Sequence, residues 1–457
     1  MERPAEAIQR EAALPVPEPM KLLLLSCSAS VLIALSHNFP AVNLVFIFAY
    51  LLLFSVFQHW GLAKGLIMTT IAITAATIAV VVNPFFLSQP LLFLLLILFM
   101  VAVFVTEVLV LYLLSSKWNF TLVAVFLFVL AWRLLFCLVP GIFPFWWSAP
   151  FQLIPLAGAV SQWILPPFIE AIFLSLVSGI YCGLQHGCWR RLSVQLGILL
   201  LLSVGITHLS NGSLSDKKTS ELTSNSIVSI GFSQLAYSAE DYGYAEKYLG
   251  FAKQIAQDYQ SSVQDIPSCR LLILPESSFV DYDPVHQEVL SQIAQIRNCY
   301  ILAGMLLEDD GGRYNCAILF PPSSKIPVVR YRKQNLVPIV EGGTLTSGTR
   351  EKVMLVDGLR ILPLICFDTM YPSSYQSRES VDLAVSISSD VFAEGTSLSR
   401  CHQAYSVFYA RTFRLPLVQV TQNGATFCIH GDGNLEEVAA PYQKIQDVTE
   451  LLIRDTK

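Results

Sequence analysis

Residues 193–232 read SVQLGILLLLSVGITHLSNGSLSDKKTSELTSNSIVSIGF, and the expected fold changes within this stretch. Residues 193–209 are apolar and long enough to cross a membrane as a helix. Residues 210–225 are rich in Ser, Thr and Lys, as is typical of a linker. Short β-forming runs begin with Ser226–Phe232 and alternate with helical segments. The stretch therefore predicts a helical membrane domain followed by an α/β domain over residues 226–457.

The composition supports this division and argues against a nucleic-acid partner. Of 457 residues, 54% are hydrophobic and 14% are charged, which is too apolar for an ordinary soluble protein. Lys and Arg are sparse before residue 210 and dense from Lys217 onward. The formal net charge is −5, and no basic stripe interleaved with aromatic residues is present.

Seven apolar stretches before residue 210 are each long enough to span about 30 Å of hydrocarbon. The leader, residues 1–19, is charged, and no small-residue cleavage site follows it, so the first stretch is predicted to be a helix and not a signal peptide. The predicted seven-helix domain therefore covers residues 20–209. The stretches are 20–36, 40–59, 63–83, 90–115, 119–140, 166–186 and 193–209.

The positions of Lys and Arg predict the orientation of these helices, because positive residues are retained in the cytoplasm. With seven spans, every basic residue that flanks them falls on the side of the N-terminus, and the opposite loops carry none. The leader is then cytoplasmic, and the domain after residue 210 is outside, which is the periplasm in a double-membrane bacterium. The flanking basic residues are Arg3, Arg10, Lys21, Lys64, Lys117, Arg190 and Arg191.

Two features of the helical part are unusual for membrane segments. Glu107 and Arg133 lie inside predicted spans, where charge is costly, so each is expected to face a polar cavity or a partner. A structural pair and a functional role are both open. Segment 141–165 is aromatic but interrupted by prolines, which favours an interfacial loop with Trp146 and Trp147 at headgroup depth. This loop is either an aromatic anchor or a mouth for a lipid substrate.

Three short strings in the α/β part place ionisable or nucleophilic side chains at the ends of expected strands, where α/β folds hold catalytic groups. They are Leu-Pro-Glu276-Ser-Ser, Tyr-Arg-Lys333-Gln-Asn-Leu-Val-Pro-Ile-Val-Glu341 and Leu-Ile-Cys366-Phe-Asp368. A lone cysteine is usually a small buried hydrophobe. The ten cysteines form no CxxC pair and have no His partners at zinc spacing, so no metal site is expected.

In their order along the chain and in their residues, these strings resemble the motifs of the nitrilase, or carbon–nitrogen hydrolase, superfamily. With seven preceding spans, the resemblance narrows to the apolipoprotein N-acyltransferase family. It implies an αββα sandwich for the catalytic domain, residues 226–457. It also implies a triad in which Glu276 is the base, Lys333 stabilises the oxyanion and Cys366 is the nucleophile. A later string, Leu415–Gly424, preceded by Tyr409-Ala-Arg411, is similar to the family's segment after the nucleophile and is expected to shape the floor of the pocket.

The expected roles agree with elementary chemistry. Glu276 in a dry pocket can accept the thiol proton of Cys366. Lys333, with the backbone N–H of Phe367, can stabilise a tetrahedral oxyanion and lower the pKa of the thiol. Glu341 either holds Lys333 charged and oriented or is a surface carboxylate. Asp368 is a further pocket carboxylate, and no metal or diffusible cofactor is required.

The resemblance implies acyl transfer in the bacterial inner membrane. The thiol takes an acyl chain from a phospholipid as a thioester, and the α-amine of a diacylglyceryl-cysteine lipoprotein then receives it. The expected partners are a phospholipid donor, a lipoprotein acceptor and membrane lipids. Both substrates are lipids, so a nucleophile at the membrane interface brings them together and keeps water away.

The sequence departs from the family pattern at several places. The family ends in a further transmembrane helix, whereas residues 436–457 are charged, so the C-terminus is expected to stay outside. The segment 342–365 is short where relatives carry a longer lid, the opening strand reads Val-Ser-Ile-Gly-Phe-Ser, and Ser389 replaces an Asn. Two alternatives stay open: a nitrilase-domain membrane protein of the conjugal-transfer type with another substrate, and a non-enzymatic scaffold with a vestigial domain.

Overall fold

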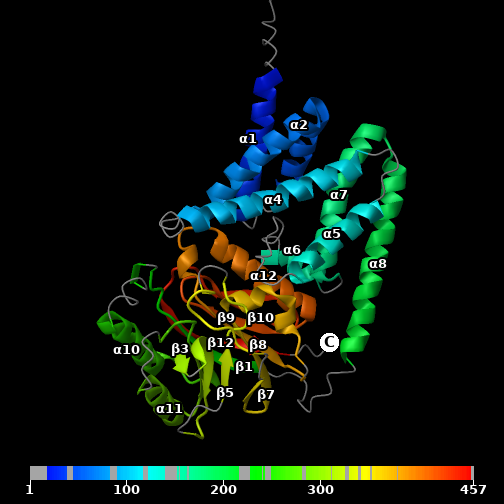
Figure 1. Cartoon of the computed structure of the whole chain (residues 1–457). Helices are drawn as coiled ribbons and strands as arrows, with labels where there is room; N and C mark the ends of the chain where they lie inside the picture. Colours follow the sequence, from blue (N-terminus) through cyan, green and yellow to red (C-terminus); the bar gives the residue numbers. More distant parts are fainter. Residues whose placement is uncertain are drawn as a thin grey trace, which may run out of the picture.

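The structure, a computed structural model, has a helical region joined to a two-sheet α/β domain (Figure 1). Trp146, Trp147 and most of the predicted leader and linker lie outside the described residues. The described residues are 18–38, 45–82, 90–116, 122–138, 152–153, 155–161, 164–215, 227–238, 240–241, 249–279, 285–309, 311–324, 329–337, 341–349, 353–377 and 379–453.

The helical region is built from long apolar segments, because a helix satisfies every backbone polar group within itself. Five of the described helices are long and apolar enough to cross a membrane, and α5 is a shorter apolar helix. The last helix runs on into the range predicted to be linker. The helices are α1 (Glu18–Asn38), α2 (Phe46–Val81), α4 (Pro90–Ser115), α5 (Leu122–Leu138), α6 (Pro155–Ser161), α7 (Pro166–His186) and α8 (Trp189–Ser215).

Two of the predicted spans, 40–59 and 63–83, overlap the single element α2. The backbone of Gly61, at φ 77° and ψ 173°, breaks the helical path between them. Glycine takes this conformation without a Cβ clash. A straight helix of 36 residues would be about 54 Å long, much more than the hydrocarbon thickness, so the break is needed if α2 is to stay within a bilayer. The seven-span count itself stays a prediction.

A buried ionic group ties four of these helices together. Arg133 on α5 donates to Glu107 on α4 at 2.9 Å and to Glu170 on α7 at 2.8 Å. Tyr50 on α2 donates to the other oxygen of Glu107 at 2.7 Å. All four side chains are buried. The expected partners of Glu107 and Arg133 are therefore each other, together with groups on two further helices.

The α/β domain contains two six-stranded sheets, with the strand orders β12-β1-β2-β3-β4-β5 and β11-β10-β9-β8-β7-β6. Strands β1, β2 and β3 are parallel, as are β7, β8 and β9. The strands are β1 (Ile227–Gln234), β2 (Leu271–Ile273), β3 (Tyr300–Asp309), β4 (Gly312–Phe320), β5 (Val329–Arg332), β6 (Met354–Val356), β7 (Leu359–Ile365), β8 (Leu383–Ser388), β9 (Leu417–Thr421), β10 (Thr426–Ile429), β11 (Leu435–Ala439) and β12 (Ile445–Leu452).

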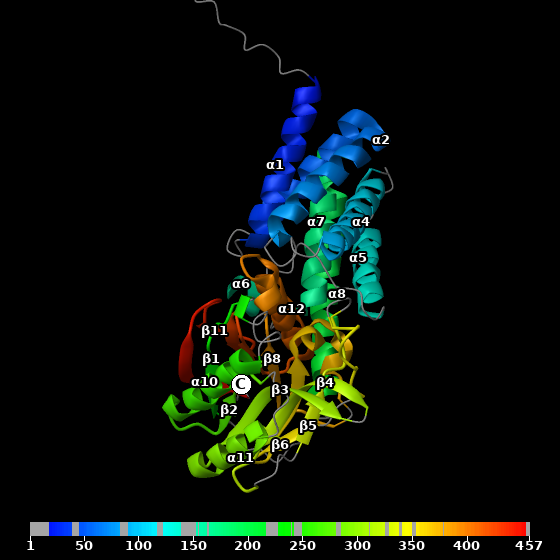
Figure 2. The same cartoon turned by 60° about the vertical axis from the view of Figure 1, so that its left-hand side comes forward.

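The two sheets pack face to face, and helices cover their outer faces (Figure 2). Helices α10 (Leu249–Asp265) and α11 (Val285–Arg297) cover the first sheet, and α12 (Leu398–Phe413) covers the second. Alternate residues of β8 illustrate the layering. Leu383, Val385 and Ile387 face the core between the sheets, as a strand with both faces buried requires. The αββα sandwich expected from the sequence is confirmed.

The α/β domain contacts the helical region through α12 and its surroundings. Ser397, just before α12, donates to the carbonyl of Val80 at the end of α2, at 3.4 Å. Arg411, in the last turn of α12, donates to the carbonyl of Gln152 at 2.6 Å. The charge pattern of the sequence predicts that Val80 and Gln152 both lie near the outer side of the membrane. The domain therefore sits at the end of the helical region opposite the predicted cytoplasmic loops.

Candidate active site

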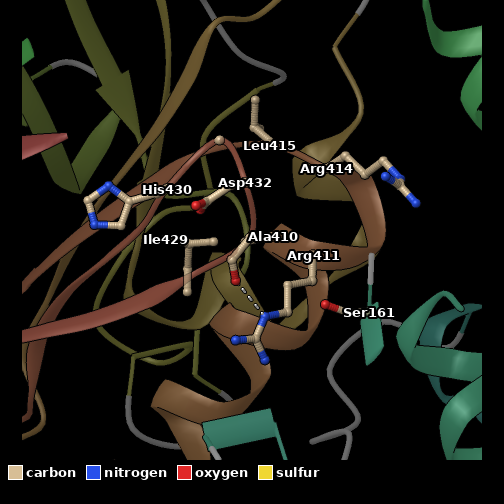
Figure 3. A pocket seen from close by; sticks show the side chains of 10 residues that line it. Ser161, Ala410, Arg411, Arg414, Leu415, Ile429, His430 and Asp432 are labelled. Carbon is tan, nitrogen blue, oxygen red and sulfur yellow. Dashed lines mark hydrogen bonds between the residues drawn. The ribbon is translucent and has the colours of Figure 1, made fainter. Parts of the chain in front are cut away.

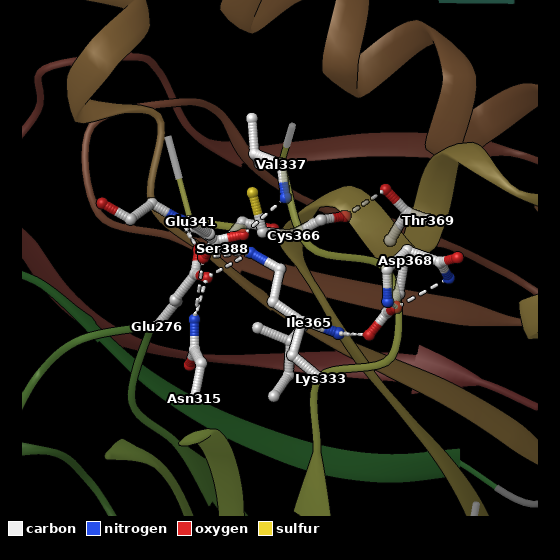
Figure 4. Close-up of polar contacts among 12 residues, drawn as sticks. Glu276, Asn315, Lys333, Val337, Glu341, Ile365, Cys366, Asp368, Thr369 and Ser388 are labelled. Atoms are coloured by element: carbon white, nitrogen blue, oxygen red, sulfur yellow. Dashed lines mark hydrogen bonds and ion pairs between the residues drawn. The ribbon is translucent and has the colours of Figure 1, made fainter. Parts of the chain in front are cut away.

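Three charged side chains, two of them just after strands and one in a turn, meet in the α/β domain (Figure 4). Lys333, which follows β5, donates to Glu276 Oε1 at 2.9 Å and to Glu341 Oε1 at 2.9 Å. Lys333 is 1% exposed and Glu276 is 3% exposed, so this is a buried ion pair and not a surface contact. The alternative interpretation of Glu341 as a detached surface carboxylate is wrong, because Glu341 binds Lys333 directly.

The carboxylate of Glu276 is fixed by two further donors. Asn315 on β4 donates to Oε1 at 2.6 Å, and the backbone N–H of Ser389, just after β8, donates to Oε2 at 2.8 Å. Glu276 follows β2, and Gly304 on the neighbouring β3 permits its close approach. A Cβ atom on Gly304 would lie 2.3 Å from the carbonyl oxygen of Pro275 and 2.6 Å from Glu276 Cα. The sheet therefore fixes both the backbone and the side chain of Glu276.

Cys366 lies where β7 turns into the short 3-10 helix η3 (Cys366–Met370). Its φ of 46° is in the left-handed region, which is unfavourable for a side chain with a Cβ and is typical of functional turns. The residue is 4% exposed. Figure 4 shows Cys366 beside Lys333, Glu276 and Glu341, with its sulfur on the side of Val337.

Electrostatics in this cluster favour an uncharged resting thiol. Burial raises the pKa of Cys366 well above its ordinary value, and the charge of Glu276 raises it further, although Lys333 opposes both effects. Burial also raises the pKa of Glu276, against the opposing effect of Lys333. Burial alone would lower the pKa of Lys333, but Glu276 and Glu341 raise it well above the ordinary value. Lys333 is therefore held as an ammonium ion.

Asp368 and Phe367 complete the turn after Cys366. Asp368 accepts from the backbone N–H and the side-chain amide of Asn335, each at 2.9 Å, and from the Tyr331 hydroxyl at 2.9 Å. It also accepts from the backbone N–H of Ile365 at 3.1 Å. These bonds tie the turn that bears Cys366 to the segment that follows Lys333. Asp368 is therefore a bracing group rather than a free pocket carboxylate, and burial raises its pKa.

A second polar group lies behind Cys366 and was not predicted from the sequence. His402 on α12 bonds Asp390 Oδ1 through Nδ1 at 2.8 Å, and its Nε2 lies 3.2 Å from the carbonyl oxygen of Cys366 and 2.9 Å from Thr369 Oγ1. Burial alone would lower the pKa of His402, but Asp390 outweighs burial and raises it. A protonated His402 donates to the Cys366 carbonyl and so holds the turn.

Within the described part of the chain, Cys366, Asp390 and His402 form a group that could be considered as a metal site. Their ligand atoms lie within 4.8 Å of one another. Both ring nitrogens of His402 are already engaged, and a protonated imidazole has no lone pair for a metal. The arrangement fits a hydrogen-bonded support better than a cation site.

The later string Leu415–Gly424 and the preceding Tyr409-Ala-Arg411, which were expected to shape the pocket floor, lie in two different places. Gly424 lies against Asp390, because a Cβ there would be 2.2 Å from Asp390 Oδ2, so the end of the string Leu415–Gly424 does adjoin the site. Arg411 does not, because it lies nine residues beyond His402 on α12, about 14 Å along the helix axis. Two site residues that were not predicted had a recognisable sequence feature. Asn315 is a polar residue within an otherwise apolar strand, and Asp390 lies just after the end of a strand. His402 gave no distinctive signal.

Comparison with known proteins identifies the α/β domain. Residues 230–446 match the family model described as carbon–nitrogen hydrolase. Apolipoprotein N-acyltransferase 1 of Treponema denticola is 24% identical over 264 residues. That match covers 46% of this chain and 48% of the relative, so the chain spans about half the length of the curated relative it matches.

Two of the solved structures that are similar to this chain come from Helicobacter pylori and Saccharomyces cerevisiae. The carbon–nitrogen hydrolase from Helicobacter pylori G27 is 15% identical, with 50% of this chain and 89% of that chain covered and a TM-score of 0.40. Nit3 of Saccharomyces cerevisiae is 17% identical, with 50% and 90% covered and a TM-score of 0.40.

The family match and the curated relative support an enzymatic role, as an acyltransferase or a hydrolase. The matched residues contain the ends of β2, β5 and β7, which carry Glu276, Lys333 and Cys366. Residues 230–446 of this chain therefore match the carbon–nitrogen hydrolase family model, and the chain, which also has apolar helices of membrane-spanning length, is similar to apolipoprotein N-acyltransferase 1 of Treponema denticola.

Proposed function

We propose that this protein transfers an acyl chain from a membrane phospholipid, through a thioester on Cys366, to the N-terminal α-amine of diacylglyceryl-cysteine lipoproteins. The observation that carries the proposal is the buried bond of Lys333 to Glu276 beside Cys366, in a domain seated on apolar helices. Glu341, Phe367 and Asp368 support the triad. The proposed location is the bacterial inner membrane, with the N-terminus cytoplasmic and the catalytic domain periplasmic.

The first half-reaction begins with the neutral thiol that the buried site favours. Glu276 accepts the proton from Cys366 as the sulfur attacks the ester carbonyl, so that the C–S bond forms and the C–O bond to glycerol breaks. The proton on Glu276 passes to the departing glycerol oxygen, which leaves as a lysophospholipid. Proton transfer from Cys366 to Glu276 relocates one negative charge within the pocket and creates no new one.

The tetrahedral intermediate carries its negative charge on the former carbonyl oxygen. The ammonium of Lys333 and the backbone N–H of Phe367 are the proposed donors to this oxyanion. Glu341 accepts from Lys333 at 2.9 Å and from the backbone N–H of Val337 at 2.7 Å, which keeps the ammonium charged and oriented. Lys333 therefore needs little reorganisation when charge develops.

The second half-reaction uses the same groups in the reverse order. The lipoprotein α-amine attacks the thioester, Glu276 takes the proton that the amine loses, and Cys366 leaves as a thiolate that recovers the proton. The products are an amide at the lipoprotein N-terminus and the free enzyme. Transfer is favoured over hydrolysis because the nucleophile is buried and the domain is joined to membrane-length helices, where an amine borne by a lipid is locally concentrated.

The thioester is the intermediate to detect. Purified full-length protein in detergent micelles is incubated with a phospholipid of defined chains, and its intact mass is measured. We expect one added acyl chain that hydroxylamine removes, absent from Cys366→Ser and present in Cys27→Ser, a control at an exposed cysteine of α1. An acyl adduct that persists in Cys366→Ser refutes the assignment. An adduct released only as free fatty acid when the lipopeptide is added favours a hydrolase.

A further inference from the structure

A cavity of about 130 Å³ lies where the α/β domain meets the helical region, away from Cys366. The end of α12 contributes Arg411 and Arg414, the turn between β10 and β11 contributes His430 and Asp432, and the end of α6 contributes Ser161. Figure 3 shows Arg411 reaching from α12 into this space, whereas the guanidinium of Arg414 points away from His430. None of these residues takes part in the proposed acyl transfer.

Arg411 is a buried cation without an acidic partner among the described residues. It is 4% exposed, and its two hydrogen bonds go to the carbonyl oxygens of Gln152, at 2.6 Å, and Gly433, at 3.1 Å. Burial lowers the pKa of Arg411 to about 10. A buried charge is costly unless an opposite charge compensates it, so this guanidinium lacks the partner that such burial normally requires.

The other polar groups at the cavity have fixed roles. His430 accepts from the backbone N–H of Leu452 through Nδ1 at 3.2 Å and so donates to Glu436 through Nε2 at 2.9 Å. Asp432 accepts from the backbone N–H of Asn434 at 2.9 Å and from its side-chain amide. With Arg414 also among the lining residues, the cavity is lined by two arginines and one carboxylate, so its lining has a net positive charge.

The level of the cavity relative to the helices points to a ligand source. The backbone N–H of Leu165, just before α7, donates to Thr207 at 3.1 Å, and Thr207 is the last residue of the apolar span Trp189–Thr207 within α8. The start of α7 therefore lies beside the end of the apolar span of α8, and α6, which contains Ser161, comes directly before α7 in the chain. Lipid headgroups lie at this depth, where apolar spans give way to polar chain.

We propose that this cavity binds a phosphate group, supplied by the headgroup of a membrane lipid, with Arg411 as its principal ligand. Guanidinium groups match the oxygens of a phosphate with paired N–H donors, and the cavity has room for such a group beside Arg411. The bound lipid would hold the end of α12 to the membrane surface. The inference does not depend on the chemistry at Cys366.

The test uses the full-length protein in detergent micelles and native mass spectrometry. The probes are dioleoylphosphatidylglycerol and dioleoylglycerol, which share their acyl chains and differ in the phosphate-bearing headgroup. We expect the wild type to retain the phospholipid in preference to dioleoylglycerol. The amount of phospholipid retained by Arg411→Gln should be lower by about tenfold or more. Arg330→Gln, at an exposed arginine of β5, is the matched control and should behave as the wild type.

Two further arms identify the source of the phosphate and guard against misfolding. Millimolar inorganic phosphate that stabilises the wild type against heating, in the absence of any phospholipid preference, would overturn the lipid source. Ser161→Phe narrows the cavity and keeps both arginines, so it should reduce retention if Arg411→Gln does not fold. Equal retention of the two probes by the wild type, or equal phospholipid retention in wild type and Arg411→Gln, refutes the site and leaves Arg411 as a structural residue that binds the carbonyls of Gln152 and Gly433.

Discussion

The ammonium of Lys333 lies 2.9 Å from a carboxylate oxygen of Glu276, and both side chains are almost fully buried. The same ammonium contacts Glu341, so two carboxylates share one cation. Burial is the main cause of the raised pKa of the nearby thiol, and the two carboxylates raise it further; the same two carboxylates raise the pKa of Lys333 against the effect of its burial. The site is arranged to pass a proton between Cys366 and Glu276.

Lys333→Met should remove the oxyanion donor and leave two carboxylates facing each other in a buried site. We expect kcat/KM for acyl transfer to fall by about 10²–10³-fold. The free energy of unfolding should also fall, by about 3–5 kcal/mol, because the partners of a buried pair are left without compensation. Lys253→Met, at an exposed lysine of α10, should change neither quantity. Equal activity in the two variants would contradict the role of Lys333.

Glu276→Gln should separate thiol reactivity from turnover. Neutralising Glu276 removes a charge that raises the pKa of Cys366, so a larger fraction of thiolate is present at a fixed pH. Alkylation of Cys366 by iodoacetamide at about pH 8 should therefore become faster, while acyl transfer is lost with the base. Peptide mass spectrometry measures the first and an acyl-transfer assay the second. Slower alkylation in Glu276→Gln would show that the two groups are not electrostatically coupled.

The pH profile of the wild type follows from the same carboxylate. Glu276 must be ionised to act as a base, and its pKa is raised by burial. Activity should therefore rise with pH through an acid limb that lies above the ordinary pKa of a glutamate. A limb at or below the ordinary value would mean that a different group controls the rate.

His402→Asn tests whether the imidazole positions the turn that bears the nucleophile. Loss of its bond to the Cys366 carbonyl should lower kcat by about tenfold and leave KM nearly unchanged, because the group does not touch substrate. His286→Asn on α11 is the control, because His286 is equally buried but lies outside the site. If both variants lose stability and have the same kcat, His402 has only a structural role.

Gly304→Ala should act on Glu276 through the backbone. The added Cβ would overlap the carbonyl of Pro275 and the Cα of Glu276, so the base must move. A displacement of about 1 Å in a catalytic group can cost about 10²-fold in rate. Gly343→Ala, whose Cβ would meet no atom within 4 Å, provides the comparison. Rates that match in the two alanine variants would show that the approach of β3 to Glu276 is not required.

The sequence predicted most of the fold because its patterns are local. Apolar stretches of membrane length and short buried strands can be found from periodicity and composition alone. The continuity of α2 could not be found in this way, because Gly61 and Lys64 read as a loop between two spans. The structure keeps both halves in one element with a break at Gly61.

Within the site, the strings that carry Glu276, Lys333 and Cys366 were visible because their spacing resembles a known family. Contacts made by tertiary packing were not. His402 lies 34 residues after Asp368, where the nearest such string ends, and only the packing of α12 on the second sheet brings it to the Cys366 carbonyl. The backbone N–H of Ser389 likewise reaches Glu276 across the interface between the two sheets.

The most direct test of acyl transfer is the N-terminus of a model lipoprotein in cells depleted of their own lipoprotein N-acyltransferase. The protein and its Cys366→Ala variant are expressed in parallel, and the N-terminal peptide is analysed by mass spectrometry. The account predicts a triacylated N-terminus with the wild type and a free α-amine with the variant. A free amine in both, with correct membrane insertion, would contradict the proposed acceptor, and acylation in both would contradict the proposed nucleophile.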